Sequence, residues 1–155
     1  MPRNLYMRYY LLGIILLAVD QLTKAVIRAK LAVGSSVNVL GELFRITHVE
    51  NRGAAFSILE GKTGLLMIVT LAIIAGAIWY MHTHKGKHWL MYTSGALIIS
   101  GGIGNLIDRA TSGQVTDMFD FSFFSPVFNV ADIAVVIGCG LLVIYILLED
   151  KLKKN

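Results

Sequence analysis

Four stretches of the sequence consist almost entirely of apolar residues, and each has the length needed to cross a bilayer. They cover residues 9–27, 63–81, 89–107 and 127–148. An α-helix of about 20 residues spans the hydrocarbon layer. The pattern therefore predicts an all-α polytopic membrane protein with four transmembrane helices. Because the chain has no internal repeat and no low-complexity segment, we expect residues 1–155 to form a single membrane-embedded domain.

The overall composition agrees with a membrane protein. Of the 155 residues, 55% are hydrophobic and only 15% are charged, whereas a soluble domain of this size carries more charge. Arg3 and Arg8, followed by LLGIILLAV, imitate the start of a secretory signal peptide. No small-residue cleavage site follows, because the next residues are Asp20 and Gln21. We therefore expect an uncleaved first helix.

A different pattern occupies the connection after the first apolar stretch. Residues 37–49, VNVLGELFRITHV, are rich in β-branched and aromatic residues with partial alternation, and Gly34 and Gly41 punctuate this region. Such a pattern is typical of short strands separated by turns. We predict a small extracytoplasmic β-sheet region between the first and second helices.

The basic residues predict the orientation of the helices. Short segments at the helix ends contain Arg3, Arg8, Lys85, Lys87, Lys151, Lys153 and Lys154. Because short cytoplasmic segments are enriched in Lys and Arg, we expect both termini and the 82–88 turn to be cytoplasmic. Residues 30–62 and 108–126 then face outward. Topology and contact with anionic lipid account for the net charge of +4, so we expect membrane lipid, and no nucleic acid, as a partner.

Several polar residues lie within or beside the predicted helices. They are Asp20, Lys24, Asn105, Asp108, Arg109, Asn129 and Asp132. In the orientation predicted above, all of them lie near the outer boundary of the membrane. Ionisable groups in spanning helices are unfavourable unless they are paired or hydrated, so this convergence marks a candidate functional site.

Most of these residues also have a structural explanation. Asp20 and Lys24 are four residues apart, with the acid before the base, and this spacing favours an ion pair that neutralises both charges. Asp108 and Arg109 are suited to anchoring a helix at the interface, and Asn105 to a hydrogen bond between helices. In SGGIGN, residues 100–105, small side chains allow another helix to approach closely.

Asp132 has no obvious partner on its own helix. Acids are available in the preceding connection, GQVTDMFDF, at Asp117 and Asp120. If this segment is extended and folds back, either acid can reach Asp132. Two carboxylates a few ångströms apart share a proton, so that one acts as a base and the other as an acid. Such a pair can activate water against an amide.

Metal and cofactor chemistry is not expected. His48 lies on a predicted strand, and His82, His84 and His88 belong to the cytoplasmic turn, away from the acids. No acid or cysteine completes a ligand set there. The sequence predicts no metal, no cofactor and no particular oligomeric state.

A non-enzymatic alternative is a proton-coupled membrane carrier or assembly factor that uses Asp20, Lys24 and Asp132 as a relay. The absence of an inverted repeat and the position of the charges at one boundary, rather than at the midplane, argue against transport. The two hypotheses differ at Asp117, because a relay within the membrane has little need of it.

Five motifs in order identify a family. They are DQLTK at 20–24, NRGAAF at 51–56, GNLIDR at 104–109, GQVTD at 113–117 and FNVAD at 128–132. Together they resemble lipoprotein signal peptidase, also called signal peptidase II, over nearly the whole chain. Thr116 and Met118 are a mild departure, since Val and Phe are common at these positions in the family.

The resemblance implies an aspartic endopeptidase of the bacterial inner membrane, with its active site near the outer face. Such enzymes remove the signal peptide from diacylglyceryl-modified prolipoproteins by cutting on the amino side of the lipidated cysteine, and the cyclic peptide globomycin inhibits them. The family motifs make Asp117 and Asp132 the catalytic pair, which selects between Asp117 and Asp120. The motif positions that line or support the site are Asn51, Gly53, Asn105, Arg109 and Asn129.

Overall fold

The computed structural model describes residues 3–53, 61–84 and 88–152. Lys85, Lys87, Lys153 and Lys154, which contributed to the predicted orientation, lie outside the described residues, as do residues 54–56 of the NRGAAF motif. Among the described residues, four helices are long and apolar enough to cross a membrane. The prediction of four apolar helices is therefore confirmed.

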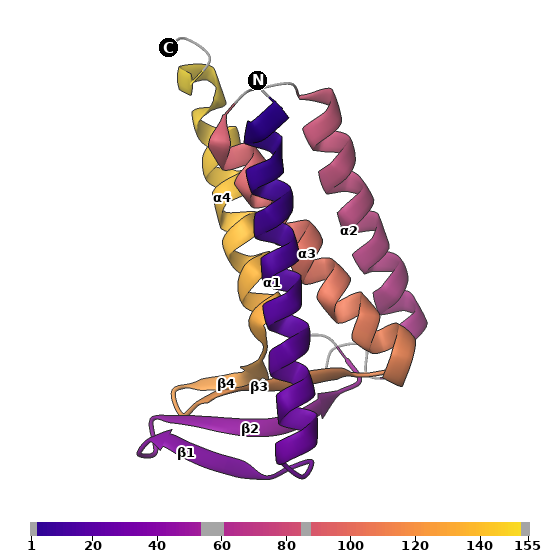
Figure 1. The fold of residues 1–155 in the computed structure, drawn as a ribbon, viewed down its shortest axis with the longest axis vertical. Coiled ribbons are helices and arrows are strands. Elements are labelled where there is room, and N and C mark those ends of the chain that lie inside the picture. Colours follow the sequence, from indigo (N-terminus) through magenta and orange to yellow (C-terminus); the bar gives the residue numbers. More distant parts are fainter. Residues whose placement is uncertain (1–2, 54–60, 85–87, 153–155) are drawn as a thin grey trace.

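The helices are α1 (Arg3–Lys30), α2 (Thr63–Thr83), α3 (Trp89–Ser112) and α4 (Val130–Leu152). They run side by side, and the two chain termini lie at the same end of the bundle (Figure 1). The fourth helix begins at Val130 rather than at residue 127, because the preceding residues through Phe128 form a strand.

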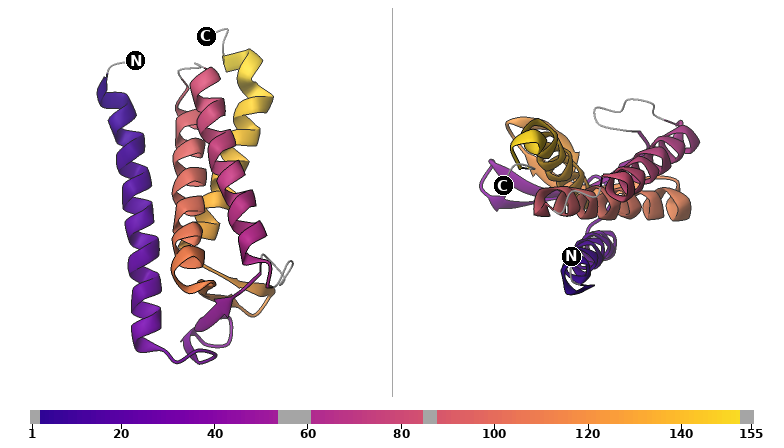
Figure 2. Two further views of the ribbon diagram at one scale, coloured as in Figure 1. Left: turned by 90° about the vertical axis from the view of Figure 1, so that its right-hand side faces the viewer. Right: turned by 90° about the horizontal axis from the view of Figure 1, so that it is seen from above.

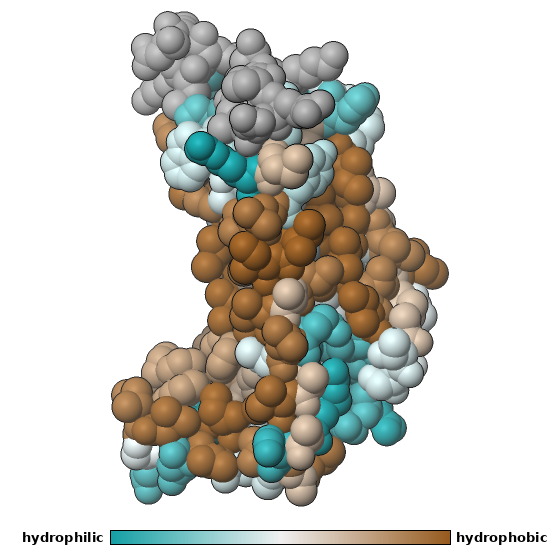
Figure 3. Space-filling view, viewed as in Figure 1, coloured by the Kyte–Doolittle hydropathy of each residue, from teal (hydrophilic) through white to brown (hydrophobic). Residues whose placement is uncertain are grey.

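Helix α3 lies at the centre of the bundle and packs against each of the other three helices (Figure 2). In its most apolar window 56% of the residues are buried, compared with 11% in α1 and in α2. The other helices expose large apolar side chains such as Ile14, Ile68 and Leu147. Apolar residues cover most of the visible middle of the bundle, where lipid would surround a spanning protein (Figure 3).

Glycines allow α3 to contact its neighbours closely. A Cβ atom added to Gly101 would collide with the carbonyl oxygen of Ala131, and one added to Gly104 would lie 2.5 Å from Oδ2 of Asp20. On the facing helix, a Cβ at Gly138 would lie 2.8 Å from the side chain of Ile98. The interpretation of SGGIGN as a segment for close helix packing is confirmed.

A four-stranded antiparallel sheet lies across the end of the bundle opposite the termini (Figure 1). Its strands are β1 (Ser36–Leu40), β2 (Phe44–Asn51), β3 (Val115–Phe121) and β4 (Phe124–Phe128), in that order. The prediction placed the sheet only between the first two helices, and this was incomplete. Because β3 pairs with β2, the connection between α3 and α4 supplies half of the sheet.

Candidate active site

Side chains from the sheet and from three helices line one pocket of about 550 Å³ next to the sheet. The charged and amide residues in its lining are Asn51, Asn105, Arg109, Asp117 and Asp132. The remaining lining is mostly apolar and continues along α2, α3 and α4 through residues such as Ile73, Ile98 and Val136. The pocket thus joins a small polar centre to a long apolar surface.

Asp132 is held by the way in which α4 begins. Oδ1 of Asn129 accepts a hydrogen bond from the backbone N–H of Asp132 at 2.9 Å, and Oδ2 of Asp132 accepts one from the backbone N–H of Asn129 at 3.3 Å. These reciprocal bonds form a capping box at the helix start. The positive end of the helix dipole also favours a carboxylate there. The capping bonds between Asn129 and Asp132, which are three residues apart, therefore position the Asp132 carboxylate.

Asp117 lies on β3 and is 1% exposed. Its Oδ1 accepts a hydrogen bond of 2.6 Å from Nδ2 of Asn129, and its Oδ2 accepts one of 3.0 Å from Nδ2 of Asn51. Both oxygens are therefore fixed by amide donors. Since Asn129 also caps α4, this one side chain connects Asp117 with the segment that carries Asp132.

Asp120 is engaged elsewhere. Asp117 and Asp120 are three positions apart on β3, so their side chains point to opposite faces of the sheet. Asp120 forms an ion pair of 2.7 Å with Arg45 and accepts a hydrogen bond from Thr47 at 2.8 Å. Among the described residues that line the pocket, Asp117 and Asp132 are the acids. The geometry thus separates the two acids that the strand sequence alone left as alternatives.

The environment of Asp117 disfavours its charged form. The pKa of this carboxyl is raised from 3.8 to about 7, first by burial and then by the nearby negative charge of Asp132, against the lowering effect of the amide donors of Asn51 and Asn129. Near neutral pH, Asp117 is therefore able both to hold and to release a proton. This is the behaviour needed for acid–base chemistry at that pH.

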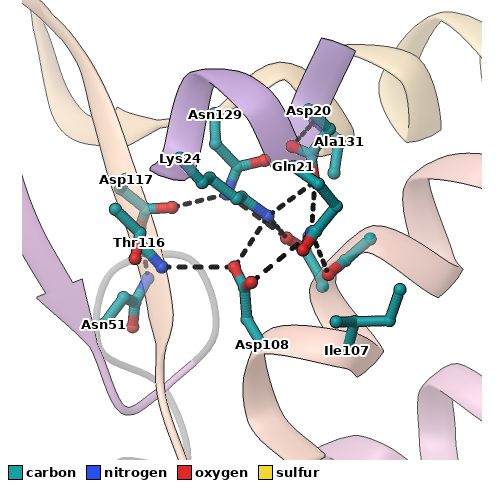
Figure 4. A network of polar contacts seen from close by, with 12 residues as sticks. Asp20, Gln21, Lys24, Asn51, Ile107, Asp108, Thr116, Asp117, Asn129 and Ala131 are labelled. Atoms are coloured by element: carbon teal, nitrogen blue, oxygen red, sulfur yellow. Dashed lines mark hydrogen bonds and ion pairs between the residues drawn. The ribbon is translucent and has the colours of Figure 1, made fainter. Parts of the chain in front are cut away.

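A second polar cluster surrounds Lys24, whose side chain is fully buried (Figure 4). Its Nζ lies 2.9 Å from Oδ2 of Asp20, 2.9 Å from Oδ2 of Asp108 and 2.9 Å from Oδ1 of Asn105. The predicted pair of Asp20 and Lys24 forms, but it includes Asp108 as well. Asp108 is 2% exposed, so its interpretation as an interfacial anchor was wrong. Its charge is balanced inside the protein instead.

Two further residues of this cluster were not predicted from the sequence. Gln21, which follows Asp20 in the DQLTK motif, donates hydrogen bonds to Asp20 and to the carbonyl oxygen of Gly104. Arg28, one turn beyond Lys24, lies 3.6 Å from Asp108 and donates to Oγ1 of Thr116. The hydroxyl of Thr116 thus provides an additional acceptor for Arg28.

Arg109 and Gly53 connect the pocket to the segment after β2. Nη2 of Arg109 donates a hydrogen bond of 3.0 Å to the carbonyl oxygen of Gly53, and the N–H of Gly53 donates one of 2.8 Å to Oδ1 of Asn51. The oxygen of the Asn51 amide is therefore occupied by Gly53, and its NH2 group is left facing Asp117. Arg109 in this way supports the donor that holds one carboxylate.

The described residues offer little for a metal ion. Within residues 3–53, 61–84 and 88–152, no group of three or more His, Cys, Asp and Glu side chains is arranged to hold one. Both carboxylates in the pocket face amide N–H groups. The arrangement is suited to controlling protons.

Comparison with known proteins identifies the family. A family model described as Signal peptidase (SPase) II matches residues 12–148, which include both pocket aspartates. The chain belongs to the signal peptidase II family. The match begins within α1, ends within α4 and includes α2, α3 and the sheet, so the motifs and the fold point to the same family.

Individual relatives agree with this assignment. The lipoprotein signal peptidase of Halothermothrix orenii is 39% identical over 142 residues, which are 92% of this chain and 97% of the relative. That of Streptococcus pneumoniae is 39% identical over 138 residues, or 88% and 90% of the two chains. A solved structure of a bacterial membrane enzyme is 32% identical, with a TM-score of 0.87, and the match covers 96% of this chain and 92% of that one.

Proposed function

We propose that this protein is an aspartic endopeptidase that removes the signal peptide from diacylglyceryl-modified prolipoproteins, cutting on the amino side of the lipidated cysteine. Membership of the signal peptidase II family supports cleavage of lipoprotein signal peptides. The observation that supports the aspartic mechanism is the presence of Asp117 and Asp132 in the lining of one pocket, each held by amide donors.

The proposed reaction uses a water molecule between the two aspartates. The ionised aspartate removes a proton from this water, the oxygen attacks the scissile carbonyl carbon, and the protonated aspartate donates its proton to the carbonyl oxygen. One hydroxyl group of the tetrahedral intermediate then returns a proton to the aspartate that had protonated the carbonyl oxygen. The C–N bond breaks, and the departing nitrogen takes the proton that was first removed from water. The pair returns to its starting state with one shared proton.

The shape of the pocket supports a substrate that lies in the membrane. The apolar lining along α2, α3 and α4 is suited to a signal-peptide helix and to the acyl chains on the cysteine, while the polar end receives the peptide bond. Such a substrate would enter by lateral diffusion. We place the protein in a bacterial inner membrane, with both termini cytoplasmic and the sheet and pocket at the outer face, on the basis of the family and the distribution of basic residues.

The remaining residues support the pair in this proposal. Asn51, Asn105 and Asn129 orient the carboxylates, and Arg109 with Gly53 supports Asn51. Asp20, Lys24 and Asp108 balance the buried charge next to them. A carrier or assembly factor is not favoured, because the polar side chains gather beside the sheet at one end of the helices.

The test is cleavage by the purified protein in detergent or lipid. A prolipoprotein carrying the diacylglyceryl group should be cut, and mass spectrometry should find the lipidated cysteine at the new amino terminus. The same precursor without the lipid should be cut much more slowly, and globomycin should inhibit the reaction. Cleavage at another bond, or equal cleavage by a variant carrying both Asp117→Asn and Asp132→Asn, would contradict the proposal.

A further inference from the structure

The ammonium group of Lys24 has its three N–H bonds matched by three acceptors, on Asp20, Asp108 and Asn105. Two of these acceptors are carboxylates, which suffice to neutralise the charge. The third is the neutral oxygen of an amide that also contacts Asp132. A purely structural ion pair does not need this third contact.

The contact with Lys24 fixes which way the Asn105 amide points. An ammonium group only donates hydrogen bonds, so the amide must turn its oxygen toward Lys24. The NH2 group of Asn105 then points the other way, and its Nδ2 donates a hydrogen bond of 2.7 Å to Oδ1 of Asp132. Because Lys24 is fully buried, water does not compete for this position.

The Asn105 amide in turn orients the amide of Asn129. Oδ1 of Asn105 also accepts from Nδ2 of Asn129 at 3.3 Å, and this NH2 group donates to Oδ1 of Asp117 at 2.6 Å. The oxygen of Asn129 faces the backbone N–H of Asp132. A rotation of Asn105 by half a turn would present an oxygen to Asp132 and an NH2 group to Asn129, so both carboxylates would lose part of their support.

We propose that Lys24 is a positioning residue for peptide cleavage, and that it acts by fixing the donor direction of the Asn105 and Asn129 amides toward Asp132 and Asp117. This inference rests on the proposed peptidase function. It assigns to Lys24 a role beyond charge balance, since the distribution of protons between the two aspartates then depends on a residue that does not line the pocket.

Other charged groups surround the two aspartates and must be held constant in a test. These groups lie on α1 and α3, and they are Asp20, Lys24, Arg28, Asp108 and Arg109. Removing Lys24 alone leaves Asp20 without its ion-pair partner. Replacing Asp20 by Asn at the same time removes one charge of each sign, and Asp108 keeps Arg28 at 3.6 Å.

Two charge-compensated variants separate hydrogen-bond direction from charge. Lys24→Gln/Asp20→Asn retains an N–H donor at position 24, whereas Lys24→Met/Asp20→Asn does not. Thermal unfolding establishes that each is folded, and kcat, KM and the pH profile of kcat are measured with diacylglyceryl-modified prolipoprotein. The Met variant should have a kcat lower than that of the Gln variant by about tenfold to hundredfold, with KM little changed, because misplaced catalytic groups have effects of this size.

The pH profile gives a readout that a structural role would not move. Without donors directed at the carboxylates, the acidic limb should move to higher pH in the Met variant and remain closer to the wild type in the Gln variant. Equal kcat values and equal pH profiles in the two folded variants would overturn the inference. In that case an N–H donor at position 24 would have no effect on the two aspartates.

A second measurement does not depend on cleavage. Infrared titration of protein labelled with carbon-13 at the aspartate carboxyl groups follows protonation of Asp117 without substrate, and Asp117→Asn identifies its band. The midpoint for the band should be higher in the Met variant than in the Gln variant. If wild-type protein does not cut the prolipoprotein but this difference is present, the proposed function fails while the coupling of Lys24 to the aspartates stands. If the midpoints coincide, the coupling fails.

Discussion

Replacement of Asp117 by Asn should stabilise the protein at neutral and alkaline pH. Burial raises the pKa of this carboxyl from 3.8 to about 7. A group whose folded-state pKa is raised contributes stability that is fully present below the unfolded pKa and is lost as pH rises through the folded pKa. Each unit of pKa corresponds to about 1.4 kcal/mol, so the wild type should lose about 4 kcal/mol of stability between about pH 4 and pH 7.

Asp117→Asn resembles the protonated side chain in size and charge, and it does not titrate. Its unfolding free energy should therefore match that of the wild type at about pH 4 and exceed it at pH 8. The measurement is thermal or denaturant-induced unfolding in detergent at a series of pH values, with intrinsic tryptophan fluorescence as the signal. We expect the curves for the two proteins to separate progressively as pH rises through the range between the two pKa values.

Asp120→Asn is the matched control, because Asp120 lies on the same strand and has a cationic partner in Arg45. It should lower the melting temperature by removing this ion pair, and it should not stabilise the protein at pH 8. If the wild type and Asp117→Asn show the same dependence on pH from 4 to 8, then burial of Asp117 does not raise its pKa, and the reasoning is wrong.

Three further substitutions test other parts of the site. Gly104→Ala should destabilise the protein by about 1–3 kcal/mol in an unfolding experiment, because the added Cβ would lie 2.5 Å from Oδ2 of Asp20. An unchanged melting temperature would mean that α1 and α3 accommodate the methyl group without cost. Arg109→Ala removes the donor to Gly53 and should lower kcat/KM in the cleavage assay, so full activity would exclude the supporting role. Asn129→Ser keeps a helix cap and Asn129→Ala does not, so the Ala variant should be less stable by about 1 kcal/mol, and equal stability would exclude the cap. Both variants lose the amide donor to Asp117, so both should move the acidic limb of the pH profile for cleavage to higher pH.

The helices could be predicted well from sequence because each is a long apolar stretch, and a bilayer permits few alternatives to a helix for such a segment. The start of α4 could not be predicted as well. Residues 127 and 128 are as apolar as the helix that follows, but Phe128 pairs with Phe119 across β3 and β4. The start of the helix is therefore set by pairing within the hairpin of β3 and β4, which the apolar character of residues 127 and 128 does not indicate.

The sheet was only partly predictable for a similar reason. The VNVLGELFRITHV segment has the composition of strands, and it forms β1 and β2. VTDMFDF was expected to be extended, but a single segment does not indicate which neighbour it pairs with. Pairing of β3 with β2 depends on how α1 and α3 are placed, which is a property of the whole fold.

The polar cluster illustrates what pairwise spacing can and cannot predict. The separation of Asp20 and Lys24 by four residues indicates their ion pair, because both lie on one helix. Participation of Asp108 and Asn105 joins α1 to α3 across more than 80 positions of sequence. Gln21 and Arg28 were not predicted, since a polar residue in a spanning helix gives no indication of which neighbouring helix it will contact.

The most direct test of the central proposal is cleavage of purified diacylglyceryl-modified prolipoprotein by the wild type and by Asp117→Asn, Asp132→Asn and Asp120→Asn, with folding verified for each. The account predicts that the first two variants are inactive and that Asp120→Asn cuts the substrate before the lipidated cysteine, as the wild type does. If Asp117→Asn or Asp132→Asn retains activity while folded, the two aspartates do not form the catalytic pair, and the proposed mechanism is contradicted.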